Sequence, residues 1–457
     1  MRTQPQRQLS LFDSTCIIVG IIIGAGIYAM APQVARGGAG IGDWINENLP
    51  SLGLEMSRWL GVLSLWLIGG LLSLCGALGY AELATAWPME GGDYVYLSKA
   101  YGRWAGFLFA WIQLAIVRPG DIVVMAFAFA IYARAVFDPL TRAGIPHAQQ
   151  VYAGAAVLVL TLINAIGVRQ GKWTQNLLTS VKVVGLVLIV AVAVFAPQGA
   201  PRPDSFGSLP VSLALVFVLF TYGGWNEMAY VAAEVKNPRK NITRALVLGT
   251  TAVIVLYLLV NGAFLYSLGY EPMAGSEAVA TDVVAKVFPR VGAGLISGLV
   301  CISALGAVNG LIFTGARITY AMGTEHRLFR GLGRWHAKTG TPLPALLVQG
   351  AIALGMIVVL GDLVETVLYT APAVYLFYLA TTLSVVVLRF REPNAERPYR
   401  MTLFPLPVVV FAGVCGYLIY SCISYAFHVA PKSLVVMAAT LLTGGVLYLV
   451  GRLQRRR

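Results

Sequence analysis

The sequence has few charged residues and few residues of the kinds that bind metal ions. Only 12% of its 457 residues are charged, whereas 58% are hydrophobic, and this balance leaves too little polar surface to cover a soluble globule. Its four histidines are scattered, and its five cysteines lie inside apolar runs without paired or ligand-like spacing. We therefore predict a polytopic membrane protein without a metal site, a disulfide framework, a cofactor or the clustered side chains of a membrane-embedded enzyme.

Long apolar runs, by contrast, occupy most of the chain. A run of about 17 to 25 apolar residues is long enough to cross a bilayer as a helix. The sequence contains twelve runs of about this length or longer, and we predict a membrane-spanning helix for each of them: 14–35, 59–86, 103–133, 151–166, 175–196, 209–234, 244–269, 292–322, 343–361, 365–389, 404–427 and 433–451.

Basic residues outnumber acidic ones, giving a net charge of +13, and their positions indicate topology rather than nucleic-acid binding. The densest clusters of Lys and Arg follow the sixth, eighth and tenth runs, at 236–244, 327–338 and 389–400. Because cytoplasmic loops of membrane proteins are rich in Lys and Arg, we predict a multi-pass protein of the inner or plasma membrane with both termini in the cytoplasm. The clusters are expected to contact anionic membrane lipids, and no nucleic-acid partner is predicted.

Glycines interrupt two of the runs near their middles. The first run, IIVGIIIGAGIYAMAPQV, is broken at Gly24 and Gly26, and the sixth, LALVFVLFTYGGWNEMAYVAAEV, at Gly223 and Gly224. Interrupted segments at corresponding positions of two halves indicate a transporter built from inverted repeats. We predict an all-α protein with four parts: an N-terminal segment 1–13, a first repeat of five spans 14–200, a second repeat of five spans 201–392, and spans eleven and twelve with a basic C-terminus, 393–457.

A broken membrane helix exposes backbone groups that suit one class of ligand. Lipid cannot satisfy free N–H and C=O groups, so an unwound segment persists only where it lines a cavity. The N-terminus of a half-helix is partly positive and binds a carboxylate, whereas the freed carbonyls are partly negative and bind an ammonium group. Two such poles side by side match an α-amino acid.

Five motifs carry a resemblance to a known family. They are GAGIY (24–28), YAELATAWPMEGGDYVYLSKAYG (80–102), IVRPGD (116–121), FTYGGWNE (220–227) and GAVNGLIFTGAR (306–317). In this order and spacing they resemble the amino acid, polyamine and organocation transporters, and within them the L-type amino acid transporter branch. The resemblance implies the leucine-transporter-like fold, with first and sixth helices broken, and amino acid transport by exchange or facilitated diffusion.

The resemblance also assigns a substrate site. It places the substrate carboxylate on the backbone of Gly24, Ala25 and Gly26, although Ala25 stands where the family usually has Ser or Thr. It implies that the carbonyls near four residues bind the substrate ammonium: Ile21, Ile23, Phe220 and Tyr222.

Further roles follow from the same resemblance. Phe220 corresponds to an aromatic gate over the substrate, and Gly223 and Gly224 leave room for its side chain. Asn226 corresponds to a polar residue that orients the unwound segment by hydrogen bonding. Glu227 has no counterpart in the family pattern, and its sequence position fits equally an attraction for cationic substrates or a pairing with a neighbouring helix.

Several residues outside the breaks are predicted to act in gating or coupling. Lys182 resembles the lysine that replaces a bound sodium ion in this branch, holding carbonyls near Ile18 or Ile21 against span eight near Ser303. Tyr257, with Asn261 beside it, corresponds to polar positions that link the gate to the site.

Acidic residues at the cytoplasmic ends of spans are the other gating candidates. Glu82 and Glu234 lie within reach of the basic clusters, and we predict ion pairs of an inner gate or solvated interfacial positions. Arg118 and Asp121 lie three positions apart on one helix face, so we expect them to neutralise each other.

Two outer loops carry further predictions. Residues 36–58 are expected to begin as a flexible glycine segment and to contain a short interfacial helix around Trp44. Residues 134–150 contain no cysteine, whereas animal L-type transporters use one there to attach a heavy chain, so no disulfide-linked heavy chain is predicted for this chain.

The sequence thus predicts sodium-independent exchange or facilitated diffusion of small to medium neutral L-amino acids by alternating access. The neutral side chain is predicted because no acid or base is clearly placed among the inferred site residues. Two alternatives stay open: a proton-coupled symporter in which Lys182 titrates, since burial lowers the pKa of a lysine, and an amino acid sensor on a transporter fold, which binds its ligand without flux.

Overall fold

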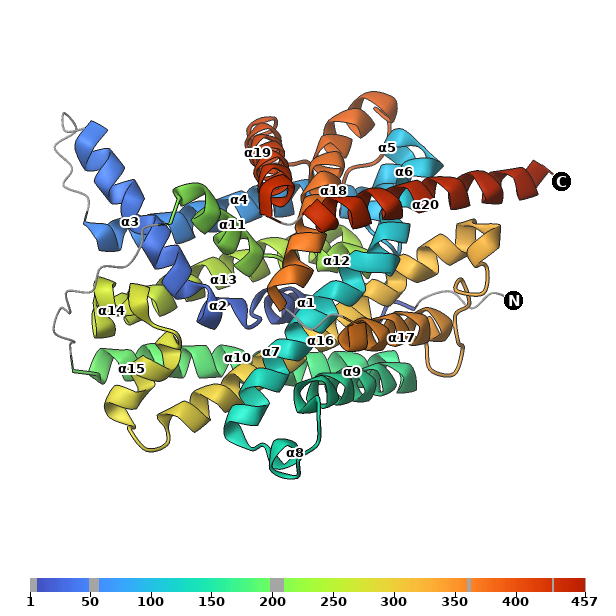
Figure 1. Ribbon diagram of the computed structural model, residues 1–457. Coiled ribbons are helices and arrows are strands. Elements are labelled where there is room, and N and C mark those ends of the chain that lie inside the picture. Colours follow the sequence, from blue (N-terminus) through green and yellow to red (C-terminus); the bar gives the residue numbers. More distant parts are fainter. Residues whose placement is uncertain (1–5, 49–56, 198–208, 360–362, 430, 457) are drawn as a thin grey trace.

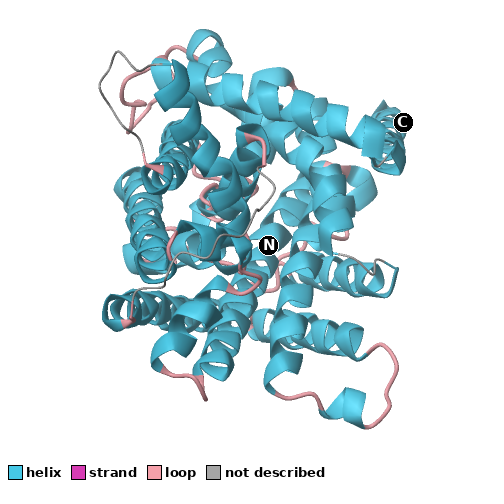
Figure 2. Cartoon of the chain, turned by 60° about the vertical axis from the view of Figure 1, so that its left-hand side comes forward, coloured by secondary structure: helices cyan, strands magenta, loops and turns pink. Residues whose placement is uncertain are grey.

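The computed structural model describes residues 6–48, 57–197, 209–359, 363–429 and 431–456. Within these ranges the chain consists of helices and loops, as Figure 2 shows. The β-bridges in the same ranges are isolated pairs, Leu9 with Val235 and His336 with Thr341. The all-α architecture predicted from the sequence is confirmed.

The first half of the chain contains the predicted spans one to five. Their helices, with the short ones between them, are α1 (Leu11–Ile22), α2 (Gly26–Ala29), α3 (Ala31–Asn48), α4 (Arg58–Ala86), α5 (Asp93–Tyr101), α6 (Arg103–Ile112), a π-helical turn η2 (Gln113–Val117), α7 (Arg118–Val136), α8 (Pro139–Arg142), α9 (Ala148–Ile166) and α10 (Val168–Phe195).

The second half contains the remaining seven predicted spans. Its helices are α11 (Val211–Thr221), α12 (Glu227–Tyr230), η3 (Ala232–Glu234), α13 (Pro238–Leu268), α14 (Tyr270–Gly275), α15 (Val279–Val287), α16 (Gly292–Glu325), η4 (Arg327–Phe329), α17 (Leu343–Val359), α18 (Leu363–Arg391), α19 (Leu406–Val429) and α20 (Pro431–Arg456).

Each predicted apolar run corresponds to helices in the described residues, and two of the runs, 14–35 and 209–234, are interrupted. Ten helical segments of the described chain are long and apolar enough to cross a membrane, and shorter apolar helices, α11 and α17, account for the other two runs. Figure 1 shows both termini at one end of the molecule, with α3, α14 and α15 at the other end.

Burial differs sharply between the first and last spans. In the apolar stretch of the first span, 83% of the residues are buried inside the protein. In the apolar stretch of the last span, only 6% are buried. Helix α1 contacts α10, α13 and α16, so the broken helix lies at the centre of the bundle. The exposed apolar side chains of α20 suit contact with lipid.

The segment after the first break differs from its prediction. Helix α3 runs without interruption through Gly37, Gly38 and Gly40, so the expected flexible start at these glycines is wrong. Packing explains the helix, because a Cβ added at Gly38 would lie 2.7 Å from the Cα of Val62, and the missing side chain lets α3 and α4 approach closely. Trp44 lies within α3, and residues 49–56 are outside the described ranges.

Both predicted helix breaks are present. Helix α1 begins with a capping box between Ser10 and Asp13 and ends at Ile22, before α2 starts at Gly26. Helix α11 ends at Thr221, and α12 starts only at Glu227. Gly224, between these two helices, has a φ of +111°, which residues with an L side chain rarely adopt. A Cβ added at Gly224 would lie 2.7 Å from Cγ2 of Ile21. The two breaks therefore touch.

Candidate functional site

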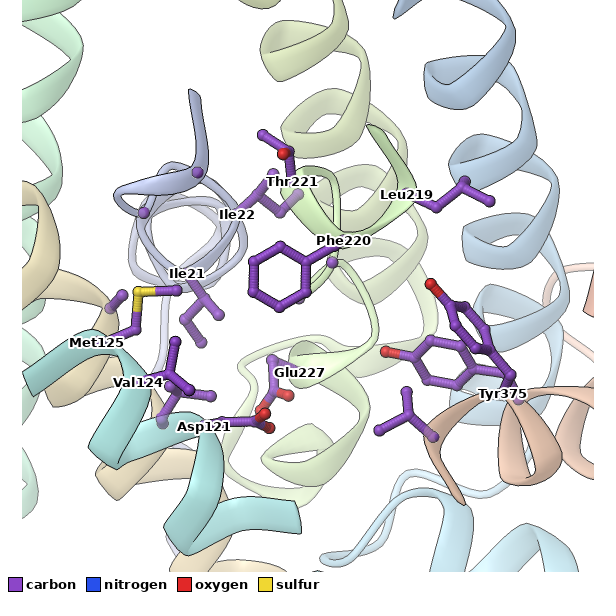
Figure 3. Close-up of a pocket in the computed structure, with 18 residues that line it drawn as sticks. Ile21, Ile22, Asp121, Val124, Met125, Leu219, Phe220, Thr221, Glu227 and Tyr375 are labelled. Carbon is purple, nitrogen blue, oxygen red and sulfur yellow. The ribbon is translucent and has the colours of Figure 1, made fainter. Parts of the chain in front are cut away.

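A pocket in the described chain lies between the two broken helices. Its wall is formed by the α1–α2 and α11–α12 breaks together with α7, α16 and α18. Figure 3 shows the Phe220 ring over the centre of this pocket, with Ile21, Val124 and Met125 on one side and Tyr375 on the other. The carboxylates of Asp121 and Glu227 lie below the ring.

The pocket contains most, though not all, of the substrate residues predicted from the sequence. Those that line it are Ile21, Gly24, Gly26, Phe220, Gly223 and Gly224. The others are buried behind it: Ile23, Ala25, Tyr222 and Asn226. Sequence analysis did not assign the apolar wall residues of α7, α16 and α18, because hydropathy alone does not distinguish a cavity wall from ordinary core packing.

The first break presents free backbone donors. Gly24 donates its N–H to the Ile22 carbonyl at 2.8 Å, but the N–H groups of Ala25, Gly26 and Ile27 donate to no acceptor in the described part of the chain. These consecutive groups lie at the start of α2, the half-helix that follows the break. Unpaired N–H groups at such a position bind carboxylates.

Some carbonyl groups at the breaks already accept hydrogen bonds from the protein, and others accept none. The Ile23 carbonyl accepts from Lys182 Nζ at 2.7 Å and from Ser303 Oγ at 3.0 Å, so protein donors already use its two lone pairs, and its role as an ammonium ligand stays a prediction. The Phe220 carbonyl accepts from the Gly223 N–H at 3.0 Å. The carbonyls of Ile21 and Tyr222 accept no hydrogen bond from the residues that the structure describes.

Lys182 is fully buried and joins the first broken helix to α16. Its Nζ donates to the carbonyls of Gly20 at 2.7 Å, Ile23 at 2.7 Å and Ser303 at 2.9 Å. The predicted contact with spans one and eight is therefore present, although the carbonyls of span one are those of Gly20 and Ile23 rather than Ile18 or Ile21. Full burial excludes a side chain that reaches the headgroups.

Tyr257 connects the two breaks from α13. Its hydroxyl donates to the Ile22 carbonyl at 2.9 Å and lies 3.4 Å from the Thr221 carbonyl. The ring packs against Tyr222 and Trp66, and Asn261 Nδ2 donates to the Tyr257 carbonyl at 2.8 Å. The position predicted to link gate and site thus contacts both unwound segments.

The pairing of Arg118 differs from its prediction. Its guanidinium donates to Glu227 Oε1 at 2.8 Å, and the two side chains are only 4% and 5% exposed. Thr314 Oγ1 donates to the other Glu227 oxygen. Arg118 and Asp121 form no contact ion pair in the described chain, because the guanidinium extends from α7 toward α12, although its charge still acts on Asp121. Of the two sequence interpretations of Glu227, the structure thus shows the pairing with a residue of a neighbouring helix.

Asn226 supports the second break through a polar network. Its Nδ2 donates to the Tyr230 hydroxyl at 2.8 Å, and its Oδ1 accepts from Tyr378 at 3.0 Å. Tyr230 in turn donates to Asp93 at 2.7 Å, and Asp93 also accepts from Tyr80 and Thr381. Asp93 was not assigned from the sequence, since its partners come from three separate helices, α4, α12 and α18.

Two buried carboxylates close the end of the molecule where the termini lie. Glu82 accepts from Arg389 at 2.6 Å and lies 3.4 Å from Arg397, both from the basic cluster after span ten. Glu234 pairs with Arg317 at 2.7 Å, with exposures of 1% and 0%. Its partner thus comes from inside span eight and not from a loop cluster. Interfacial solvation is excluded for both carboxylates, which are buried.

Comparison with known proteins decides the family. The family model described as "Amino acid permease" matches residues 9–449. The chain belongs to this permease family. It is 33% identical over 419 residues to "b(0,+)-type amino acid transporter 1" of Mus musculus, covering 89% of this chain and 81% of that protein. It is 32% identical over 423 residues to "Large neutral amino acids transporter small subunit 2" of Homo sapiens, covering 89% and 74%.

Family membership confirms the broad predictions. The permease is a multi-pass membrane protein of the leucine-transporter-like fold and an amino acid transporter of the L-type branch, and it is not an enzyme. The pocket between its two breaks is accordingly the candidate substrate site.

Proposed function

We propose that this permease moves α-amino acids across the membrane by sodium-independent exchange or facilitated diffusion, with the substrate held between the two helix breaks. The observation that carries the proposal is the Lys182 ammonium, which donates to carbonyls of both α1 and α16. In sodium-coupled transporters of the resembling fold a cation joins these two spans. A fixed ammonium supplies that positive charge without a bound ion.

The free backbone groups at the breaks suit the charged head of the substrate, that is, its α-carboxylate and α-ammonium groups. The N–H groups at Ala25, Gly26 and Ile27 suit its α-carboxylate, and the unoccupied Ile21 carbonyl suits its ammonium. Phe220 lies over the pocket in the place of a gate. These backbone groups would bind any α-amino acid, whatever its side chain.

Alternating access would move the two repeats, 14–200 and 201–392, relative to each other. We propose that the Glu82 and Glu234 ion pairs belong to the inner gate and break when the site opens to the cytoplasm, where both termini would lie. We also propose that the chain works without a disulfide-linked heavy chain, because residues 134–150 contain no cysteine.

The neutral-substrate prediction rested on the lack of a clearly placed acid or base among the inferred site residues. Two acids, Asp121 and Glu227, line the pocket, so the charge of the preferred substrate side chain stays open.

Reconstitution in liposomes tests the transport mode. Uptake of a labelled amino acid mixture is measured with and without internal unlabelled amino acids, external sodium and an imposed pH gradient. The proposal expects uptake that ignores sodium and the pH gradient, and stimulation by internal substrate would assign exchange. Uptake driven by the pH gradient would instead favour proton symport through Lys182, and binding without flux would favour a sensor.

A further inference from the structure

One carboxylate in the substrate pocket has no hydrogen-bond or ion-pair partner in the described chain, although the charge of Arg118 on the same helix acts on it through space. Asp121 lies on α7 and lines the pocket, yet it makes no hydrogen bond and no ion pair with the residues that the structure describes. Glu227, the other acid of the pocket, is different, because Arg118 and Thr314 occupy its two oxygens. Figure 3 shows both carboxylates converging on one region of the pocket.

The charges of this region do not balance. Arg118 contributes one positive charge, and Glu227 and Asp121 contribute two negative ones. A zwitterionic substrate adds no net charge, so these three side chains keep an excess of one negative charge in a buried site unless a carboxyl group takes up a proton. Such a charge is costly unless a cation joins it, and a substrate with one positive charge on its side chain restores neutrality.

The position of Asp121 fits the far end of a substrate. The free N–H groups of the first break, at Ala25 and Gly26, hold the head, and Asp121 lines the wall on α7 below the Phe220 ring. The wall between them includes Val124 and Met125, an apolar surface suited to the methylene stem of a long cationic side chain.

We propose that Asp121 is the residue that selects substrates with a cationic side chain, by binding the ammonium or guanidinium tip of a basic α-amino acid. The proposal rests on the proposed function, because it assumes that the same pocket holds the substrate's head. It makes basic amino acids preferred substrates over neutral ones of similar length.

Competitive uptake in proteoliposomes tests this selectivity. Initial rates are measured for labelled arginine and labelled leucine in the unchanged protein, in Asp121→Asn and in Asp121→Glu. Because hydrogen bonds to charged groups are strong, the ratio of kcat/KM for arginine over leucine should fall roughly ten- to hundredfold in Asp121→Asn. Asp121→Glu, which keeps the charge, should retain most of the preference.

A matched control separates local binding from general surface charge. Asp138 follows α7 at its outer end, where it pairs with Arg134 at 2.7 Å away from the pocket. Asp138→Asn should leave the arginine to leucine ratio unchanged. Protection of each variant by arginine or leucine against heat unfolding gives a second readout and shows whether the variant is folded.

The outcomes are distinguishable. Absence of uptake of both amino acids by the unchanged protein would overturn the proposed function itself. Leucine uptake without arginine uptake, or the same ratio in Asp121→Asn, would overturn the role of Asp121 alone. Leucine uptake that is driven by a pH gradient and loses that drive in Asp121→Asn would make Asp121 a proton carrier, which also overturns this inference.

Discussion

Replacing Lys182 with methionine removes an ammonium group while keeping a side chain of similar length. The three hydrogen bonds to Gly20, Ile23 and Ser303 are lost together. Ile23 keeps the Ser303 hydroxyl as a donor, but the Gly20 carbonyl lies in the last turn of α1, where the helix itself supplies no donor. The break in α1 therefore loses its attachment to α16.

The size of the effect follows from these bonds. A hydrogen bond to a charged group contributes about 1.5 to 3 kcal/mol, so the net loss of only one of the three weakens the bridge by about ten- to a hundredfold. We expect the initial rate of amino acid uptake by Lys182→Met proteoliposomes to fall by at least about tenfold, with or without sodium.

Lys286 offers a matched control for this experiment. Its ammonium, in the last turn of α15, also donates to backbone carbonyls, those of Ser267 and Pro197, which belong to neither break. Lys286→Met should transport at the rate of the unchanged protein. Undiminished uptake by folded Lys182→Met would refute the reasoning that this ammonium holds the first broken helix in its working position.

Three further predictions concern the second break and the end where the termini lie. Gly224→Ala places a Cβ 2.7 Å from Ile21 at a φ of +111°, so substrate protection against heat unfolding should disappear, and intact protection would contradict the close contact of the breaks. Glu234→Gln leaves the buried Arg317 charge unpaired, and we expect a loss of roughly 3 to 5 kcal/mol in stability, seen as a lower Tm; an unchanged Tm would contradict it. Burial raises the pKa of Glu90, in the loop between α4 and α5, to about 7; the folded state therefore binds this proton more tightly than the unfolded state, and stability should fall as pH rises from about 4.5 to 7. The Tm of Glu90→Gln should fall less over that range, and parallel curves would contradict the shift.

The helices of this protein could be predicted from the sequence with little error. Apolar length alone located all twelve runs, because a membrane helix must satisfy its backbone internally and cover its surface with apolar side chains. The paired glycines at 24 and 26 and at 223 and 224 located both breaks. The glycines at 37, 38 and 40 were misjudged, since only their packing against the neighbouring helices α4 and α11 explains why they stay helical.

The side-chain partners were predictable only in part. The contact of Lys182 with α16 followed from the resemblance, but the choice between Ile18, Gly20 and Ile21 depends on the rotation of α1 about its axis. Arg118 was paired with the acid nearest in sequence, whereas its partner Glu227 lies 109 residues away. Sequence spacing predicts pairs within a helix and gives no information about pairs between helices.

The claim at the centre of this account is that the two breaks bind the charged head of an α-amino acid. The most direct measurement compares three competitors of labelled amino acid uptake: the unlabelled amino acid, its methyl ester, which lacks the carboxylate charge, and the corresponding amine, which lacks the carboxylate altogether. The account predicts that only the intact amino acid competes strongly, because the N–H groups at Ala25, Gly26 and Ile27 need an anion. Equal competition by all three compounds would contradict it.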